Sequence, residues 1–466
     1  MENNIPKKIQ KVLLINPVLS FFDDKRKIEH LGLAYISASL KNKGINCDII
    51  DFQSIDTDDM IKYVLNIIEN NNYEVIGISV LFFTEKKVLS ICKEIKERFN
   101  VYIVLGGIQA TINHATLIKN DFVDYVIRGD GEVAFCNIIN HINGDRKKLI
   151  GCTYKDGQEI VITHEINYVE NLNELPFPTR SGISNIIPIS SSRGCVYSCS
   201  FCCIPSVNSK WRIRSSDNIA LEVFRIFQNN VNLELFYVDD NFLLDIDRGI
   251  DIAKKIKEKC GKVIPFTFAT RSDQLNRAGI HKLSLLKKLG CKMIELGIEN
   301  GSNSVLKRYN KQLKIEDNLL ALNLLDSCNI DVYVDYILFD GFISIDELKE
   351  NIVFLKKSLL WGFYPPVIYT RAFPFQGTQI EESYAKKEKY FSDKNVELIY
   401  EKMQAFKKNI QTLIDQLLID LPSNYNIERT WLLSVPYDYF EGLVVGEYIE
   451  EKEIIANINL IKNMIV

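Results

Sequence analysis

The chain reads RGCVYSCSFC from Arg193 to Cys202, and this stretch decides how the surrounding sequence is interpreted. Cys195, Cys199 and Cys202 have the spacing Cys-x-x-x-Cys-x-x-Cys, directly after the apolar run 186–191, which predicts a strand. Three thiolates on one loop can bind three irons of a 4Fe-4S cubane and leave the fourth iron open. The pattern therefore predicts an iron–sulfur site at the carboxyl end of a strand.

A zinc site and inert core cysteines are the alternatives for this stretch. A structural zinc ion needs four ligands, commonly in two separated pairs, and Cys203 beside Cys202 is expected to point away from the same metal. The chain has 11 cysteines, and outside the group at 195–203 we interpret them as small buried hydrophobic residues. A disulfide framework is therefore not expected.

Strands and helices alternate on the carboxyl side of the cysteine stretch, over residues 186–379. The predicted strands are Ile186–Ser191, Leu233–Val238, Ile264–Ala269, Met293–Ile298, Val332–Phe339 and Val367–Thr370. Helical stretches separate them, with Asp217 and Ser344 as plausible N-caps. Six such units predict a partial (β/α)6 barrel, whose chemistry is expected at the carboxyl ends of its strands.

The same alternation on the amino side predicts a first α/β domain over residues 1–143. Buried strands separated by helices favour a doubly wound parallel sheet. Ligands of such sheets bind at the carboxyl ends of the strands, although the glycines there can equally serve to turn the chain tightly. No Gly-x-Gly-x-x-Gly follows the first strand, so no dinucleotide fingerprint is present. The candidate ligand-binding residues are Ser79, Gly106, Gly107, Gly129, Gly131 and Glu132.

Two further segments complete the expected organisation. The turn signal Asp156-Gly157 predicts a short hairpin in a linker over residues 144–185. Residues 380–466 lose the strand and helix rhythm and are expected to form a small, mostly helical appended region.

Composition narrows the class of partner. The chain has 466 residues, 47% hydrophobic and 25% charged, with a formal net charge of -4, so it lacks the basic excess of nucleic-acid-binding proteins. No apolar run approaches 18 residues, so no membrane association is expected. Because residues 1–11 have no apolar core of a secretion signal, a cytoplasmic location is expected, with the cysteines reduced.

The cysteine loop resembles that of the radical S-adenosylmethionine enzymes, which carry an aromatic residue before the last cysteine, as Phe201 does here. The resemblance implies that S-adenosylmethionine chelates the open iron and that the reduced cluster cleaves its sulfonium to a 5'-deoxyadenosyl radical. It also implies a low-potential reductant of the flavodoxin or ferredoxin type.

Other strand ends match the family's cofactor positions. Asp239 and Asp240 stand where many members carry Gly-Gly-Glu, and they could accept hydrogen bonds from the methionyl ammonium or simply form a polar turn and helix cap. Arg271 and Glu299 resemble residues near the cofactor's carboxylate and ribose, with surface salt bridges as the alternative.

The order of the two domains resembles the subgroup with an N-terminal cobalamin-binding domain, through the stretches 30–35, 76–80, 105–111 and 127–132. The resemblance implies that the glycine-rich loops let the backbone approach cobalamin. The Asp-x-His-x-x-Gly motif is absent, and neither His30 nor His114 has that context, so a histidine ligand to cobalt is not expected.

The leading functional hypothesis is cobalamin-dependent radical methylation of an unactivated carbon in a small molecule or peptide. One alternative is a cobalamin-free radical epimerase, dehydratase or rearranging enzyme, whose first domain is a scaffold. Another is a cobalamin or iron–sulfur sensor. The sequence assigns no catalytic residue beyond those that bind cofactors.

Overall fold

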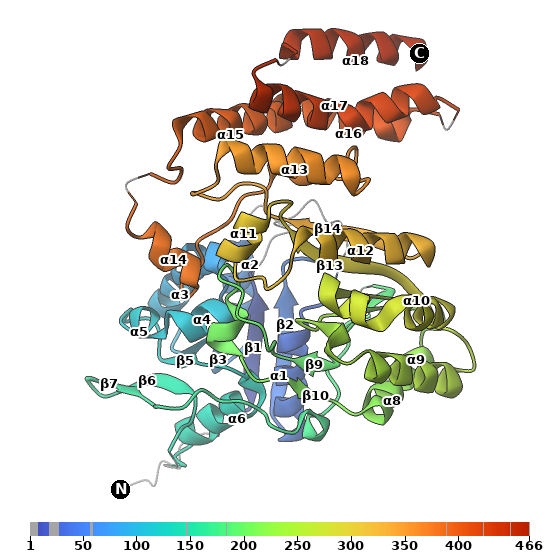
Figure 1. The fold of residues 1–466 in the computed structure, drawn as a ribbon. Coiled ribbons are helices and arrows are strands. Elements are labelled where there is room, and N and C mark those ends of the chain that lie inside the picture. The colour runs from blue at the N-terminus through green and yellow to red at the C-terminus, as the bar shows by residue number, and fades with distance from the viewer. Residues whose placement is uncertain are drawn as a thin grey trace, which may run out of the picture.

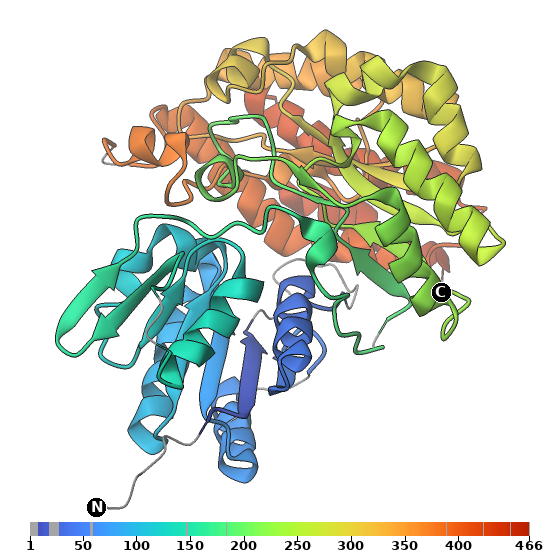
Figure 2. The same cartoon turned by 90° about the horizontal axis from the view of Figure 1, so that it is seen from below.

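The computed structural model describes residues 8–17, 28–55, 59–145, 148–182, 184–387, 389–422, 424–447 and 449–465. Two α/β units lie side by side, and helices of the carboxyl-terminal region stack over the second unit (Figures 1 and 2). Residues 1–7, which belong to the segment interpreted as lacking a secretion signal, lie outside the described residues.

A parallel sheet with helices on both faces forms the first unit, which confirms the doubly wound prediction. Its parallel strands are β1 (Lys11–Asn16), β2 (Asn46–Asp51), β3 (Val75–Ser79), β4 (Tyr102–Gly106) and β5 (Tyr125–Ile127), in the order β2-β1-β3-β4-β5. Alternate residues of β1 face opposite cores: Leu13 and Ile15 pack with α2 (Met60–Asn71) and α3 (Glu85–Arg98). Val12 and Leu14 pack with α1 (Leu31–Asn42) and α6 (Gly131–Ile142).

A hairpin extends this sheet beyond β5. Strands β6 (Cys152–Asp156) and β7 (Glu159–Ile162) meet at the turn around Gly157, whose φ is +61°, and β6 pairs antiparallel with β5. The first sheet therefore has seven strands, two of which come from the region between the domains.

The second unit is a partial barrel, as predicted. Its parallel strands are β8 (Ile186–Ile189), β11 (Glu234–Tyr237), β12 (Phe266–Arg271), β13 (Cys291–Glu299) and β14 (Asp331–Tyr336), in the order β14-β13-β12-β11-β8. The intervening helices are α8 (Ser216–Phe227), α9 (Ile246–Cys260), α10 (Ser272–Lys288), α12 (Ile315–Ser327) and α13 (Ile345–Lys357).

The expected sixth strand is different in the structure. Val367–Tyr369 form the 3-10 helix η4, and this segment joins the barrel only through an isolated bridge between Phe339 and Arg371. The prolines at 365 and 366 explain the difference, because proline has no amide N–H to donate to a strand ladder.

Two helices of the barrel, α8 and α13, start at serine caps. Ser344 caps α13 by accepting from the Glu347 N–H, as predicted. The cap of α8 is Ser215, which accepts from the Asn218 N–H, so the expectation for Asp217 is wrong: Asp217 lies in the first turn of the helix. A serine at the N-cap and an acidic residue in the first turn both suit the exposed N–H groups there.

Six elements form the described part of the carboxyl-terminal region. These are α14 (Gln379–Tyr384), α15 (Lys394–Phe406), η5 (Lys407–Gln411), α16 (Thr412–Asp420), α17 (Asn426–Val445) and α18 (Glu451–Ile465). α17 packs against α13, so the region continues the core of the barrel. In the described part of the chain, no helix has the length and apolar character needed to cross a membrane.

Aromatic and amide side chains join the two units. Phe82 and Phe83, in the 3-10 helix η1 (Phe82–Thr84) after β3, contact Phe375 edge to face, with ring centroids 5.4 and 5.7 Å apart. The amide of Gln109 donates to Gln376 at 3.0 Å. The carboxyl-end loops of the first sheet therefore lie against the segment that follows the last barrel bridge.

Candidate cofactor and active site

The cysteine loop occupies residues 194–211 and is closed at its base by a two-stranded hairpin. Strands β9 (Ser192–Arg193) and β10 (Arg212–Ile213) pair antiparallel, with Arg193 opposite Arg212. Gly194 follows with a φ of +87°, and a Cβ there would lie 2.3 Å from the Lys210 carbonyl oxygen. Only glycine fits this start, which explains the Arg-Gly-Cys order in the sequence.

The three cysteines lie half-buried on this loop, at the carboxyl end of β8. Burial raises the pKa of the Cys202 thiol to about 12, so a bound metal would be needed to hold it as a thiolate near neutral pH. Among the described residues, no three His, Cys, Asp or Glu side chains converge where a single metal ion would bind. In a cubane each thiolate binds a different iron, so the three cysteines need not converge on one point.

Asp239 and Asp240 both bind the base of the cysteine loop. Asp239 accepts from the Ser191 N–H at 2.7 Å and from the hydroxyls of Ser191 and Ser192 at 2.5 and 2.6 Å. Asp240 accepts from the Gly194 N–H at 2.8 Å. Burial raises the pKa of both carboxyls, although these hydrogen bonds oppose the shift. The two predicted cofactor residues therefore also fix where the loop leaves the barrel.

Arg271 lies beside the cysteines. Its Nη1 is 3.5 Å from Cys199 Sγ, its Nη2 donates to the Lys311 carbonyl oxygen at 2.6 Å, and its guanidinium lies 3.7 Å from the ring centroid of Tyr197. Asp273 accepts from its Nε at 3.0 Å. The side chain is 7% exposed, so it is held at the strand end rather than in a surface salt bridge.

Glu299 and Phe201 meet around Lys311, a residue that the sequence analysis did not single out. Lys311 Nζ lies 2.7 Å from Glu299 Oε1 and 5.9 Å from the Phe201 ring centroid. Its neighbours Asn310 and Gln312 have φ values of +49° and +56°, a strained turn with no glycine to mark it in the sequence. The structure thus brings Phe201, Arg271 and Glu299 to one side of the cysteine loop.

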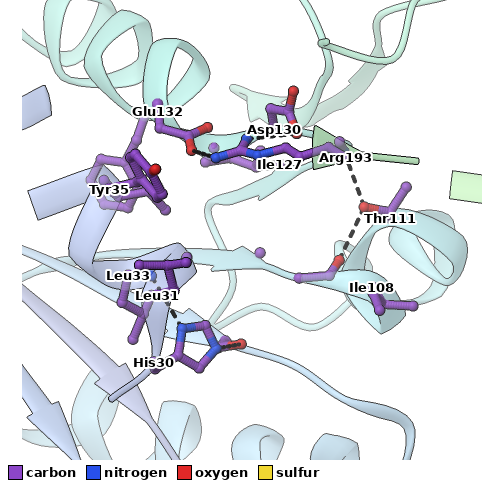
Figure 3. Close-up of a pocket in the computed structure, with 18 of the residues that line it drawn as sticks. His30, Leu31, Leu33, Tyr35, Ile108, Thr111, Ile127, Asp130, Glu132 and Arg193 are labelled. Atoms are coloured by element: carbon purple, nitrogen blue, oxygen red, sulfur yellow. Dashed lines mark hydrogen bonds and ion pairs between the residues drawn. The ribbon is translucent and has the colours of Figure 1, made fainter. Parts of the chain in front are cut away.

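A cavity of about 400 Å³ lies between the first sheet and the barrel (Figure 3). The first domain lines it with the residues predicted to bind cobalamin: Ser79, Gly106, Gly107, Gly129, Gly131 and Glu132. The barrel side contributes Ser192, Arg193, Asp240 and the short helix α7 (Ile204–Val207). All six predicted first-domain residues therefore share a cavity with the base of the cysteine loop.

Gly106 and Gly107 form the glycine floor of this cavity, and each is a glycine for a different reason. A Cβ added to Gly106 would meet no protein atom within 4 Å, so the open space begins directly at the backbone. Gly107 has a φ of +101°, and a Cβ there would lie 2.9 Å from the Val80 carbonyl oxygen. Glycine is required at 107 by conformation, whereas at 106 it leaves room for the ligand.

His30 also lines the cavity, but its hydrogen bonds disfavour cobalt ligation. Nδ1 accepts from the Leu33 N–H at 3.1 Å, and Nε2 lies 3.3 Å from Ser79 Oγ. Burial lowers the pKa of His30, although Asp51 opposes the shift, so the ring is neutral and carries its proton on Nε2. His114 contacts Thr153 of β6, with Nδ1 2.9 Å from the hydroxyl.

Two family models match the chain, one in each of its two α/β units. The B12 binding domain matches residues 25–139, and the radical SAM superfamily matches residues 189–355. The chain belongs to the radical S-adenosylmethionine enzymes, in the subgroup with an N-terminal B12-binding domain. This confirms the resemblance seen in the sequence.

Individual proteins are similar to the chain over most of its length. An uncharacterized methyltransferase of Pyrococcus horikoshii is 25% identical over 395 residues, which cover 80% of this chain and 83% of that protein. The structure of the cobalamin-dependent radical enzyme OxsB, with aqua-cobalamin and S-adenosylmethionine bound, has a TM-score of 0.76 at 20% identity and covers 94% of this chain and 72% of that chain. The methyltransferase TsrM from Kitasatospora setae has a TM-score of 0.65 at 16% identity, covering 81% of this chain and 75% of that chain.

Proposed function

We propose that this enzyme methylates an unactivated carbon of a small-molecule substrate. The observation that carries the proposal is the shared cavity, because the glycine floor of the first domain and the base of the cysteine loop line the same space. Bound cobalamin would supply a transferable methyl group there, and the cluster with S-adenosylmethionine would supply the radical. A methyl carrier and a radical source must both reach one substrate carbon, and this arrangement meets that requirement.

We assign the cofactor-binding roles as follows. Cys195, Cys199 and Cys202 hold the cluster. Arg271 pairs with the carboxylate of S-adenosylmethionine, and Glu299, neutralised by Lys311, accepts from its ribose hydroxyls.

The acidic pair after β11 has divided roles in this proposal. Asp240 has one oxygen bound to the Gly194 N–H, and its side chain lines the cavity, so it accepts from the methionyl ammonium. Asp239 has both oxygens occupied by Ser191 and Ser192, so it acts by positioning the loop. Phe201 packs edge to face on Tyr309, with centroids 5.3 Å apart, and shields the cofactor from water.

The reductant and location follow from the chemistry. We propose a flavodoxin or ferredoxin partner, because clusters of this kind work at low potential. None of the 11 cysteines is in a disulfide, which suits the reducing conditions of the cytoplasm. The net charge of -4 supports a reaction without nucleic acid.

The experiment that tests this proposal is anaerobic purification after expression with cobalamin, followed by assay of iron, sulfide and cobalt. S-adenosylmethionine labelled in its methyl group is then added with a low-potential reductant and candidate substrates. We expect four irons and one cobalt per chain, 5'-deoxyadenosine, and label in the product. Four irons without cobalt would contradict the methylase and favour a radical rearrangement. A protein without iron would overturn both.

A further inference from the structure

Two arginines at the base of the cysteine loop reach across to the first domain. Arg193 Nη1 lies 3.1 Å from Asp130 Oδ1, and its Nη2 donates to Glu132 Oε1 at 2.7 Å (Figure 3). Arg212, opposite Arg193 in the hairpin, donates to Asp130 Oδ2 at 2.5 Å. We call these four residues, Arg193, Arg212, Asp130 and Glu132, the interdomain ion-pair network.

The network is buried, so each charged side chain in it needs its ion-pair partner to compensate for the loss of water. The side chains of Arg212 and Glu132 are 2% and 3% exposed, and those of Asp130 and Arg193 are 11% and 16% exposed. Burial alone would raise the pKa of Asp130, yet the two arginines hold that pKa below its ordinary value. Removal of one partner would leave an uncompensated charge in the interior, which is strongly unfavourable.

The network also connects two walls of the cavity. On the first-domain side, Asp130 is the N-cap of α6 and Glu132 lies in its first turn, and both line the cavity. Glu132 Oε2 is buried without a hydrogen-bond partner among the described side chains, which leaves an acceptor for an amide N–H of a ligand.

On the barrel side, the second half of the cysteine loop forms the opposite wall. Val207 and Asn208 line the cavity. The Asn208 side-chain oxygen Oδ1 accepts from Arg212 Nη2 at 2.8 Å. The backbone carbonyl oxygen of Asn208 accepts from the Cys195 N–H at 3.4 Å. One residue therefore touches the cavity, the network and the backbone of a cluster cysteine.

We infer that the interdomain ion-pair network couples the two cofactor sites, so that cobalamin in the cavity orders the cysteine loop and a bound cluster tightens the cavity. The inference rests on the proposed function. Arg193 is a positioning residue in this scheme, because it contacts the loops that hold the cofactors. Coupling of this kind is reciprocal: each cofactor changes the affinity for the other by the same factor.

The test is the affinity for hydroxocobalamin, measured by absorbance titration under anaerobic conditions with full-length protein that either carries the reconstituted cluster or lacks it. The ratio of the two dissociation constants is the coupling factor. We expect a factor of about five or more in the wild type, and a factor near one in Arg193→Gln. Arg193→Lys should give an intermediate factor, because an ammonium lacks the planar fork that pairs with two carboxylates.

A spectroscopic readout separates coupling from general destabilisation. Cobalamin should shift the electron paramagnetic resonance signal of the reduced cluster in the wild type and leave it unshifted in Arg193→Gln. The matched control is Lys210→Gln on the same loop, since Lys210 pairs with Glu170 at the surface and should leave the coupling unchanged.

The possible results are distinct. Equal affinities in the wild type, or coupling that survives in Arg193→Gln, would overturn the inference while the proposed function stands. Failure of both protein forms to bind hydroxocobalamin would remove the proposed function together with the inference. If Arg193→Gln does not fold, Glu132→Gln, which preserves size and shape, decides by the same ratio.

Discussion

The two sheets present different chemistry at their carboxyl ends, although both ends face the space between the domains. The first sheet presents glycine backbone, with Gly106 as the last residue of β4 and Gly107 directly after it. The barrel ends in ionisable side chains, including Arg271 and Glu299. From this difference we expect the first sheet to bind a large ligand mainly by shape and backbone approach, and the barrel to bind a small, charged ligand by ion pairs.

The largest effect is expected when one of the three cluster ligands of the barrel is removed. Cys199→Ala should abolish bound iron and S-adenosylmethionine cleavage, because two thiolates no longer hold the cubane. Iron and sulfide assays with detection of 5'-deoxyadenosine measure this. Cys203→Ala is the matched control and should keep both, since Cys203 lies outside the three-cysteine motif. Loss of iron in both variants would contradict the assignment of Cys195, Cys199 and Cys202.

The next largest effect concerns the first sheet, where a side chain added at Gly106 should weaken cobalamin binding. Gly106→Val adds a side chain that meets no protein atom at its Cβ, so the protein should fold normally while the cavity is partly filled. The added side chain would clash with bound cobalamin at a cost of about 1–3 kcal/mol, which weakens binding about tenfold or more. Absorbance titration measures the affinity, and iron content should stay unchanged. Unaltered cobalamin binding would show that Gly106 does not face the ligand.

At the carboxyl end of the barrel, the loss of the Arg271 charge should weaken the binding of S-adenosylmethionine. Arg271→Gln should weaken S-adenosylmethionine binding about tenfold, as expected for a hydrogen bond to a charged group worth about 1.5–3 kcal/mol. Equilibrium dialysis with the cluster-loaded protein measures this. Arg277→Gln serves as control, because the Arg277 side chain is 71% exposed and its pairing with Asp273 is at the surface. An equal loss in both variants would contradict a direct role for Arg271.

The smallest effect concerns pH and a carboxyl of the last barrel strand. Desolvation of the carboxyl, together with the charges of Glu299 and Glu295, raises the pKa of Asp335 to about 7, although the residue as a whole is exposed, which keeps the expected effect small. Because this folded pKa lies above the ordinary value of about 4, stability should fall as the pH rises from about 4 to about 7 and stay constant above.

Asp335→Asn should remove this part of the pH dependence, and thermal melts at about pH 5 and about pH 8 measure it. Asp331→Asn on the same strand is the control and should keep the wild-type difference. If Asp335→Asn melts with the wild-type pH dependence, Asp335 does not titrate in this range.

Much of the fold could be predicted because it depends on local patterns. Alternating apolar runs gave both sheets, and the cysteine spacing with its place after β8 gave the candidate cluster site. The sixth strand was predicted over Val367–Thr370, and the two preceding prolines prevented it. The pairing of Arg193 with Glu132 was missed, because an ion pair between residues 61 positions apart leaves no periodic trace in a sequence. Lys311 was missed because no glycine marks the turn in which it lies.

The hairpin β6–β7 has a consequence for how the protein is made. Until residues 152–162 leave the ribosome, the edge of β5 has no partner, and Gly129, whose added Cβ would lie 2.2 Å from the Asn167 carbonyl oxygen, lacks the segment it packs against. Asp130 likewise lacks its hydrogen bond from the Val169 N–H, which is 2.8 Å long in the complete fold. The first domain therefore completes only when translation has passed about residue 169, well beyond its last parallel strand. A fragment that ends at residue 143 would expose an open strand edge to neighbouring chains.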